Sequence, residues 1–224
     1  KERPILFSGA MVRAILEGRK TQTRRVVKPQ PPASAVNCEY SENGWGTEKR
    51  KPHFLFSDEA AFETMAVDCP YGKPGDRLWV RETWQCVAEV KGQRHVSNPR
   101  FEMKPGVRWI EYHATPRIDE PSPTWRPSIH MLRRHSRITL EVVAVRVERL
   151  RTITAGDAIA EGLESMKVYD DPLYPDDWAR YYKDYKSGQF TMHGEVFSYA
   201  SLWESINGPG SWDLNPWVWV VEFR

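Results

Sequence analysis

The sequence predicts an α+β protein with a mainly antiparallel sheet or a small β-barrel. Its segments run in the order helix, several strands, helix and closing strand, which differs from the regular alternation of a βαβ protein. The chain has 224 residues, of which 40% are hydrophobic and 10 are Trp, so it can build a substantial core. We expect one folded domain over residues 1–224.

The N-terminal part predicts a helix followed by a strand. Residues 9–17 carry apolar side chains at helical spacing, and Ser8 is suited to cap the start of that helix. Gly18 stands where a helix commonly ends. Residues 21–27 are rich in β-branched side chains and predict a strand, which ends at Pro29.

Later segments predict more strands than helices. Strand patterns cover residues 77–84, 107–113, 138–150 and 217–223. Residues 29–75 lack a sustained period and suggest an irregular arm, and residues 87–106 suggest an exposed excursion.

Three helices are predicted in the C-terminal half. Thr154 is suited to cap the first, with Asp157 reaching back to it. Aromatic and apolar side chains at spacings of three and four predict the other two, over residues 178–188 and 199–206.

The charge is nearly balanced in total but uneven along the chain. There are 32 Lys and Arg against 30 Asp and Glu, a formal net charge of +2. Residues 1–30 have a local charge of +6, residues 126–151 form a second basic stretch, and residues 151–224 have a local charge of −6. These numbers exclude a generally basic protein, but they allow a local cationic site.

The sequence predicts no metal, cofactor or membrane span. Three cysteines without paired spacing favour a reduced, cytoplasmic protein. A structural zinc on Cys38, Cys69 and His53 is the minor alternative, because the usual ligand spacing is missing. No apolar run approaches the roughly 18 residues that a membrane helix requires.

The segment from Gly18 to Arg25 concentrates chemistry where the helix is expected to end and the strand to begin. Lys20 is suited to act as a base for the hydroxyl of Thr23 if burial or neighbouring positive charge lowers its pKa. Arg19, Arg24 and Arg25 supply such charge. The alternative is a basic turn that contacts solvent.

The motif Gly18-x-Lys20-x-x-Thr23-x-Arg25 resembles the signature of the ASCH superfamily, which has a PUA-like β-barrel fold and is associated with RNA. The chain is most similar to the longer ASCH-domain proteins of phages and prophages, from residues 3–7 to residues 215–220. This resemblance implies a PUA-like, mostly antiparallel small barrel with flanking helices. It also implies long insertions at 29–75, 87–130 and 165–212, because minimal members are shorter.

Among ASCH proteins, this motif is similar to that of small bacterial enzymes that deacetylate N4-acetylcytidine. The resemblance implies an amidohydrolase in which Lys20, Thr23 and Glu161 are catalytic, with Glu164 as the second choice for the acid. On a helical wheel, Glu161 lies opposite Ile159 and Leu163, which suits a solvent-facing glutamate as well as a carboxylate in a cleft.

The expected substrate is a modified nucleoside or nucleotide, or a short single-stranded nucleic acid. Arg19, Arg24 and Arg25 are the candidate substrate-binding cations, and Trp79 is a candidate for stacking on a pyrimidine, although it also suits the core. No obligate protein partner is expected.

Three other functions remain open. The first is an RNA-binding or single-stranded nucleic-acid-binding module, in which Lys20, Arg24, Arg25 and the arginines of residues 133–149 contact phosphates. The second is a ribonuclease, which the lack of an evident acidic metal cluster or histidine pair disfavours. The third is a phage inhibitor or modifier of host nucleic-acid metabolism.

Overall fold

The computed structural model shows an α+β protein made mostly of strands. It describes residues 1–32, 35, 37–41, 53–57, 64–90, 93–96, 107–116, 125–171, 174–192 and 194–224. The α-helices of these ranges are α1 (Gly9–Leu16), α2 (Ala155–Ala160) and α3 (Glu195–Asn207), and the short 3-10 helices are η1 (Ser128–His130), η2 (Arg133–His135) and η3 (Leu150–Thr152). No helix in these ranges is both long enough and apolar enough to cross a membrane.

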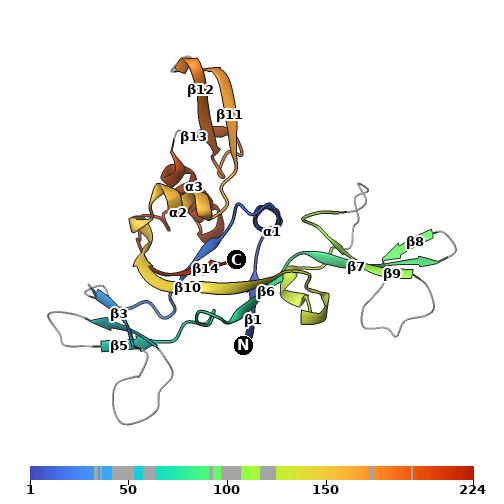
Figure 1. Cartoon of the computed structure of the whole chain (residues 1–224), viewed down its shortest axis with the longest axis horizontal. Helices are drawn as coiled ribbons and strands as arrows, with labels where there is room; N and C mark the ends of the chain where they lie inside the picture. Colours follow the sequence, from blue (N-terminus) through green and yellow to red (C-terminus); the bar gives the residue numbers. More distant parts are fainter. Residues whose placement is uncertain are drawn as a thin grey trace, which may run out of the picture.

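A mixed five-stranded sheet forms the centre of the molecule (Figure 1). Its strands lie in the order β1 (Glu2–Leu6), β6 (Arg77–Arg81), β10 (Thr139–Arg149), β14 (Trp217–Phe223) and β2 (Gln22–Val26). The β1–β6 pair is parallel, and the other three pairs are antiparallel. Within the described residues β1 and β2 are the sheet edges, so this sheet is not a closed barrel.

Three smaller sheets extend from the central sheet in different directions (Figure 1). Their strands are β3 (Asn37–Ser41), β4 (His53–Ser57) and β5 (Thr64–Val67) in the first, β7 (Trp84–Val90), β8 (Gln93–Val96) and β9 (Val107–Tyr112) in the second, and β11 (Ser165–Asp171), β12 (Tyr174–Lys183) and β13 (Phe190–Met192) in the third. They coincide largely with the three segments expected to be insertions.

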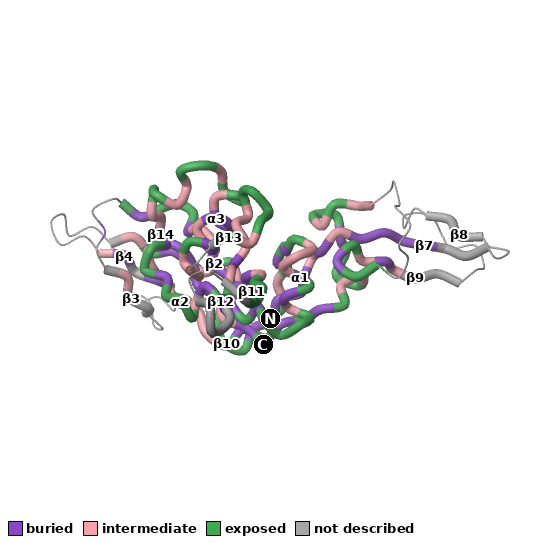
Figure 2. The backbone as a smooth tube through the Cα atoms, turned by 90° about the horizontal axis from the view of Figure 1, so that it is seen from above, coloured by how far each residue is buried: buried purple, intermediate pink, exposed green. Residues whose placement is uncertain are grey.

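The core lies on both faces of β14, because alternate side chains of a strand point to opposite faces. Trp217, Trp219, Val221 and Phe223 join one hydrophobic cluster, which also receives Phe54 and Phe56 from β4. Val218 and Val220 join a second cluster beneath α2 and α3. Figure 2 shows β14 as a buried strand between these layers. The interior side of α3 therefore belongs to the core and not to a peripheral excursion.

Most of the predicted elements are confirmed. The helix after Ser8, the strand after residue 21 and the strands near 107–113, 138–150 and 217–223 occur at nearly the expected positions. The helix after Thr154 has the predicted capping box, and the helix over 199–206 forms the centre of α3.

The predicted helix over residues 178–188 is wrong, because β12 occupies residues 174–183. β12 pairs with β11 over most of its length, with Tyr182 opposite Ser165. Aromatic residues favour strands when a partner strand is present, and β11 provides that partner.

The region after residue 77 also differs from the prediction. The strand expected over 77–84 ends at Arg81, and a separate strand, β7, begins at Trp84. Between them, the buried Glu82 receives two hydrogen bonds of 2.9 Å from Arg137. The described part of residues 87–106 belongs to β7 and β8, and Val87 is buried, so an entirely exposed excursion is wrong.

Candidate active site

The turn between α1 and β2 places Lys20 in the interior. Gly18 has a φ of +72°, which favours glycine, and its N–H donates to the Ile15 carbonyl at 3.0 Å. The N–H of Lys20 donates to the Ala14 carbonyl at 3.0 Å, so the chain folds back over the end of α1. Lys20 is consequently only 2% exposed.

The end of α2 brings Glu161 to the same place. Lys20 and Glu161 form an isolated backbone bridge, and the N–H of Thr21 donates to the Ala160 carbonyl at 2.9 Å. Gly162 follows with a φ of +87°, and a Cβ atom there would lie 2.8 Å from the Cβ of Lys20. Glycine at position 162 therefore allows the two backbone segments to approach this closely.

The solvent-facing alternative for Glu161 is wrong. Glu161 is 3% exposed, whereas Ile159, on the side that the wheel assigned to the interior, is 48% exposed. α2 ends at Ala160, and Glu161 is its C-cap residue, so the helical wheel does not extend through Gly162 to Leu163.

Lys20 and Glu161 form a buried ion pair. The Nζ atom of Lys20 lies 2.8 Å from Oε2 of Glu161 and also donates to the carbonyls of Glu161 and Gln22, at 2.9 and 2.8 Å. Burial lowers the pKa of Lys20, the carboxylate of Glu161 opposes this change, and the charges of Arg25 and Arg24 favour it. A lowered pKa makes the neutral amine, which is the basic form, more accessible.

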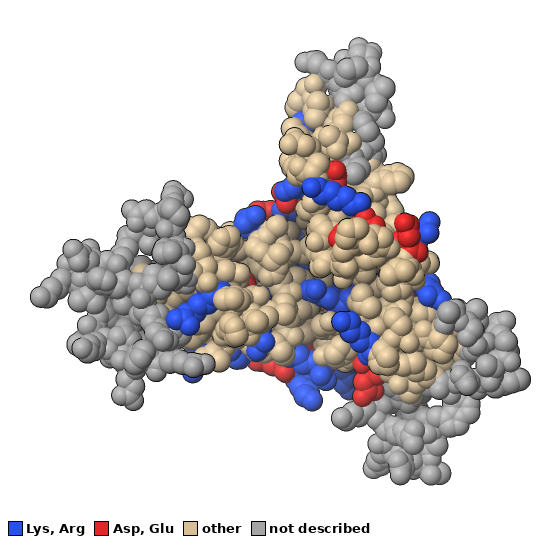
Figure 3. All heavy atoms as spheres, turned by 180° about the vertical axis from the view of Figure 1, so that it is seen from behind, with Lys and Arg blue, Asp and Glu red and all other residues tan. Residues whose placement is uncertain are grey.

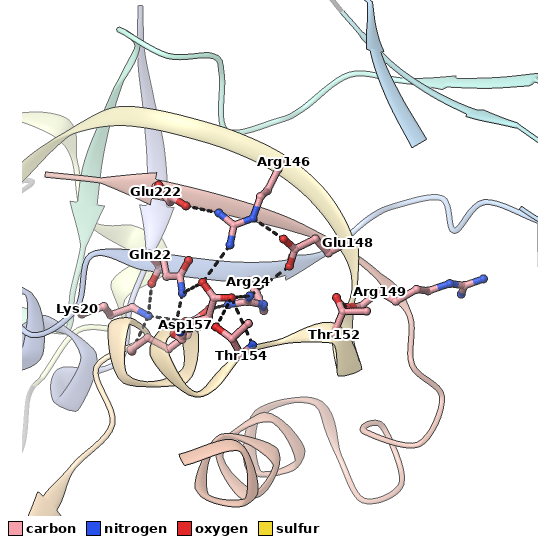
Figure 4. Close-up of polar contacts among 11 residues, drawn as sticks. Lys20, Gln22, Arg24, Arg146, Glu148, Arg149, Thr152, Thr154, Asp157 and Glu222 are labelled. Atoms are coloured by element: carbon pink, nitrogen blue, oxygen red, sulfur yellow. Dashed lines mark hydrogen bonds and ion pairs between the residues drawn. The ribbon is translucent and has the colours of Figure 1, made fainter. Parts of the chain in front are cut away.

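Arg24 links this pair to further carboxylates, as Figure 4 shows. Its side chain is completely buried and lies 3.4 Å from Glu161, 3.2 Å from Asp157 and 3.3 Å from Glu148. Arg146 contacts Glu148, Asp157 and Glu222. We call these seven residues the ion-pair network: Lys20, Arg24, Arg146, Glu148, Asp157, Glu161 and Glu222. The network connects β2, β10, β14 and the end of α2.

A small pocket lies beside the network, between β2 and α3. Thr23, Arg24, Arg25 and Glu161 contribute to its wall, and α3 contributes Tyr199 and other residues; the complete lining is Met11, Thr23, Arg24, Arg25, Val26, Glu161, Tyr199, Leu202, Trp203, Ile206 and Asn207. Its volume is about 60 Å³. One water requires roughly 10–15 Å³, so the pocket has room for several waters or a small organic group.

Several polar groups of the pocket wall are available to a ligand. The hydroxyl of Thr23 has no hydrogen bond to any described residue. The buried Nε of Arg24, Nε of Arg25 and Nε1 of Trp203 also lack partners in the described part of the chain. Buried donors are normally satisfied, so this arrangement favours a ligand with hydrogen-bond acceptors.

The other predicted site residues lie in different surroundings. Arg25 lines the pocket and donates to the Leu6 carbonyl at 2.6 Å. Arg19 does not line it, because its guanidinium contacts Glu17 and the carbonyls of residues 162 and 163. Trp79 is buried in β6 beneath Arg81, two strands away from β14. Glu164 pairs with Lys183 at 3.1 Å.

The proposed phosphate contacts of Lys20 and Arg24 do not suit this geometry. Both side chains have 0% exposure and are paired with carboxylates. Along residues 133–149, Arg133 pairs with Glu2 and Arg146 pairs within the network. A polynucleotide therefore requires other cations than Lys20, Arg24, Arg133 and Arg146.

Several site residues were not predicted from the sequence. Gln22 donates to Asp157 at 3.0 Å, and Tyr199 and Trp203 line the pocket from a helix far along the chain. The alternation of Gln22 and Arg24 within a strand is a weak signal of one polar face. Only the fold brings that face to α2 and α3.

The described residues contain no group of three or more side chains suited to hold a metal ion. Cys38 and Cys69 form no disulfide and are half-buried, while the side chain of His53 lies outside the described residues.

Comparisons with protein-family models, curated proteins and solved structures find no match to this chain.

We expect Lys20→Met to lower the free energy of unfolding by about 3–5 kcal/mol, because it leaves the buried Glu161 carboxylate without its ammonium partner. Adding Glu161→Gln removes that unpaired charge and should restore part of the loss. Urea titration monitored by tryptophan fluorescence measures both effects. Lys183→Met, which breaks a partly exposed pair with Glu164, should cost about 1 kcal/mol or less. Equal losses in the two single variants would contradict the importance of the buried pair.

Asp157 should make the network sensitive to acid. Partial burial raises the pKa of Asp157, but hydrogen bonds from Gln22 and Thr154 and the charge of Arg24 outweigh it and lower the pKa to about 2. The ionised carboxylate therefore stabilises the fold above about pH 4, and this stabilisation is lost as the pH falls towards 2.

The test compares Asp157→Asn with the wild type in urea titrations between pH 5 and pH 2.5. The stability difference between the two proteins should shrink as the pH falls. Asp213→Asn, at an exposed position, is the control and should follow the wild type. A stability difference for Asp157→Asn that does not change with pH would exclude this role of the carboxylate.

Proposed function

We propose that the protein is an amidohydrolase that removes a small acyl group from N4-acylated cytidine or a related modified nucleoside or nucleotide. The observation that carries this proposal is the buried Lys20–Glu161 pair next to a pocket that Glu161 and Thr23 line. The pair supplies a base and a carboxylate and Thr23 supplies a hydroxyl, and these are the groups that acyl transfer requires. The resemblance of the Gly18–Arg25 motif to ASCH enzymes supplies the substrate class.

In the proposed reaction, the oxygen of Thr23, or of a water bound to it, attacks the acyl carbon. Neutral Lys20 accepts the proton of the attacking oxygen, and Glu161 holds the resulting ammonium. The carbon–N4 bond then breaks, and the proton passes to the leaving amine. When Thr23 is the attacking group, water hydrolyses its ester and releases the carboxylic acid.

This proposal requires one rearrangement. The three hydrogen bonds of Lys20 Nζ go to Gln22 and Glu161, and none goes to Thr23. The amine must exchange its bond to the Gln22 carbonyl for one to Thr23 or to a bridging water. The free donors of Arg24, Arg25 and Trp203 are suited to bind the oxygen that becomes negative during attack.

The assignment of the fold to a known family is part of the same proposal. We propose that the five-stranded sheet with α1 and α2 is the PUA-like core of an ASCH domain. The order of elements supports this, because α1, the Gly18–Arg25 turn, β2, β6, β10 and α2 follow one another as the resemblance implies. The smaller sheets are then elaborations of that core.

The direct test incubates the purified protein with N4-acetylcytidine and its 5′-monophosphate and follows cytidine release by chromatography. Thr23→Val removes the hydroxyl at nearly constant volume and should lower kcat at least 100-fold. Lys20→Met and Glu161→Gln should lower it similarly, whereas Thr21→Val at an exposed position should retain activity. An N4-benzoyl substrate should react more slowly than the acetyl one, because the pocket is small.

The pH profile gives a second readout. Because the base must be neutral, kcat should rise with pH through the lowered pKa of Lys20 and fall at acid pH. If the folded protein releases no cytidine from acetyl, propionyl and benzoyl derivatives across this pH range, the enzyme proposal fails. Full activity of Thr23→Val would instead exclude the role given to Thr23.

A further inference from the structure

A second and larger groove lies at the base of the β7–β9 sheet. One side is formed by the end of β6 and the start of β7, and the other by residues 125–134, which include η1. The complete lining is Arg81, Trp84, Trp125, Arg126, Pro127, Ile129, His130, Met131, Leu132 and Arg134. Its volume is about 870 Å³, and it shares no lining residue with the pocket at Thr23.

The groove carries unpaired positive charge. Arg81, Arg126 and Arg134 line it, and none of them forms an ion pair with a described residue. The neighbouring Arg133 and Arg137, by contrast, are paired with Glu2 and Glu82. Within the described residues no carboxylate lines the groove. Figure 3 shows basic side chains near the base of this arm.

Apolar and aromatic side chains alternate with these arginines. Trp125 is half-buried, and Ile129 and Leu132 are 56% and 46% exposed. Trp84 is buried beneath Arg126, whose guanidinium carbon lies 5.7 Å from the ring centre. A ligand with flat apolar faces is suited to cover the exposed part of this surface.

The side chains that line the groove are held by hydrogen bonds of the surrounding segments. The Nε atoms of Arg81 and Arg126 and the Nε1 atom of Trp84 are buried and have no partner in the described part of the chain. The backbones of Trp84 and Arg126 exchange hydrogen bonds of 3.2 and 2.8 Å. The guanidinium of Arg81 donates to the Ile129 carbonyl at 3.4 Å. The wall of the groove is therefore held in place before a ligand binds.

We propose that this groove binds a single-stranded polynucleotide. The arginines are suited to contact successive phosphates, and Trp125 with the neighbouring apolar side chains is suited to contact unpaired bases. A purely acidic chain such as polyglutamate would satisfy the charges but has no flat faces for this surface. Polynucleotide binding here goes beyond the amidohydrolase activity and does not depend on Thr23 or Lys20.

The experiment measures fluorescence anisotropy of labelled 12-nucleotide RNA and DNA single strands against the full chain at several salt concentrations. Each phosphate contact contributes a slope of about 0.7 in log K against log salt. Arg134→Gln, at an exposed position, should weaken binding and reduce the slope by about 0.7. Trp125→Leu should weaken binding roughly tenfold, with little change of slope.

Two controls separate the groove from general charge and from the pocket. Arg224→Gln removes the same charge at an exposed position paired with Glu141, and it should bind like the wild type. Thr23→Val should also bind normally, so a failure of the amidohydrolase proposal leaves this one standing. Thermal unfolding checks that each variant is folded.

Three outcomes would overturn the proposal: no binding of either single strand at low salt, equal effects of Arg134→Gln and Arg224→Gln, or equally tight binding of polyglutamate or of phosphatidylserine vesicles. Preference for a duplex over both single strands would also exclude the role given to the apolar side chains, because paired bases do not expose their faces. A difference between the RNA and DNA strands would identify the natural ligand class.

Discussion

The ion pair between Lys20 and Glu161 is the constraint on which the site depends. Both side chains are buried, so each charge requires the other and the carbonyls around Lys20. Arg24 adds a second buried cation, which Glu161 alone would not balance, and Asp157 and Glu148 complete the compensation. The end of α2 is thereby held against the edge strand β2.

Stability and chemistry use the same atoms in this arrangement. Glu161 compensates the charge of Lys20 in the resting protein, and in the proposed reaction it holds the ammonium formed when Lys20 accepts a proton. Burial supplies the lowered pKa of Lys20, but it also makes loss of either partner costly for the fold. A substitution that changes reactivity at this site is therefore expected to change stability as well, unless it leaves the charges intact, as Thr23→Val does.

The sequence predicted features that depend on local pattern. Strand-forming residue patterns identified β10 and β14, and Ser8 and Thr154 identified helix starts. Features that depend on distant partners were missed: residues 178–183 pair with β11 in a hairpin, and Tyr199 reaches the pocket from α3. The motif singled out Lys20, which is buried against Glu161 in the structure, and the family resemblance selected Glu161 from many acidic residues. The burial of Glu161 could not be predicted from a helical wheel, because α2 ends at Ala160.

The close approach at Gly162 has a consequence for recognising such sites in other chains. Since a side chain at this position would collide with Lys20, the requirement for glycine is as strict as that for the charged partner beside it. Two short motifs, Gly-x-Lys after one helix and Glu-Gly after another, therefore describe the same ion pair, although 141 positions separate the lysine from the glutamate. A sequence search that requires both motifs, with a strand-forming segment after the first, should therefore separate chains with this site from other chains better than either motif alone.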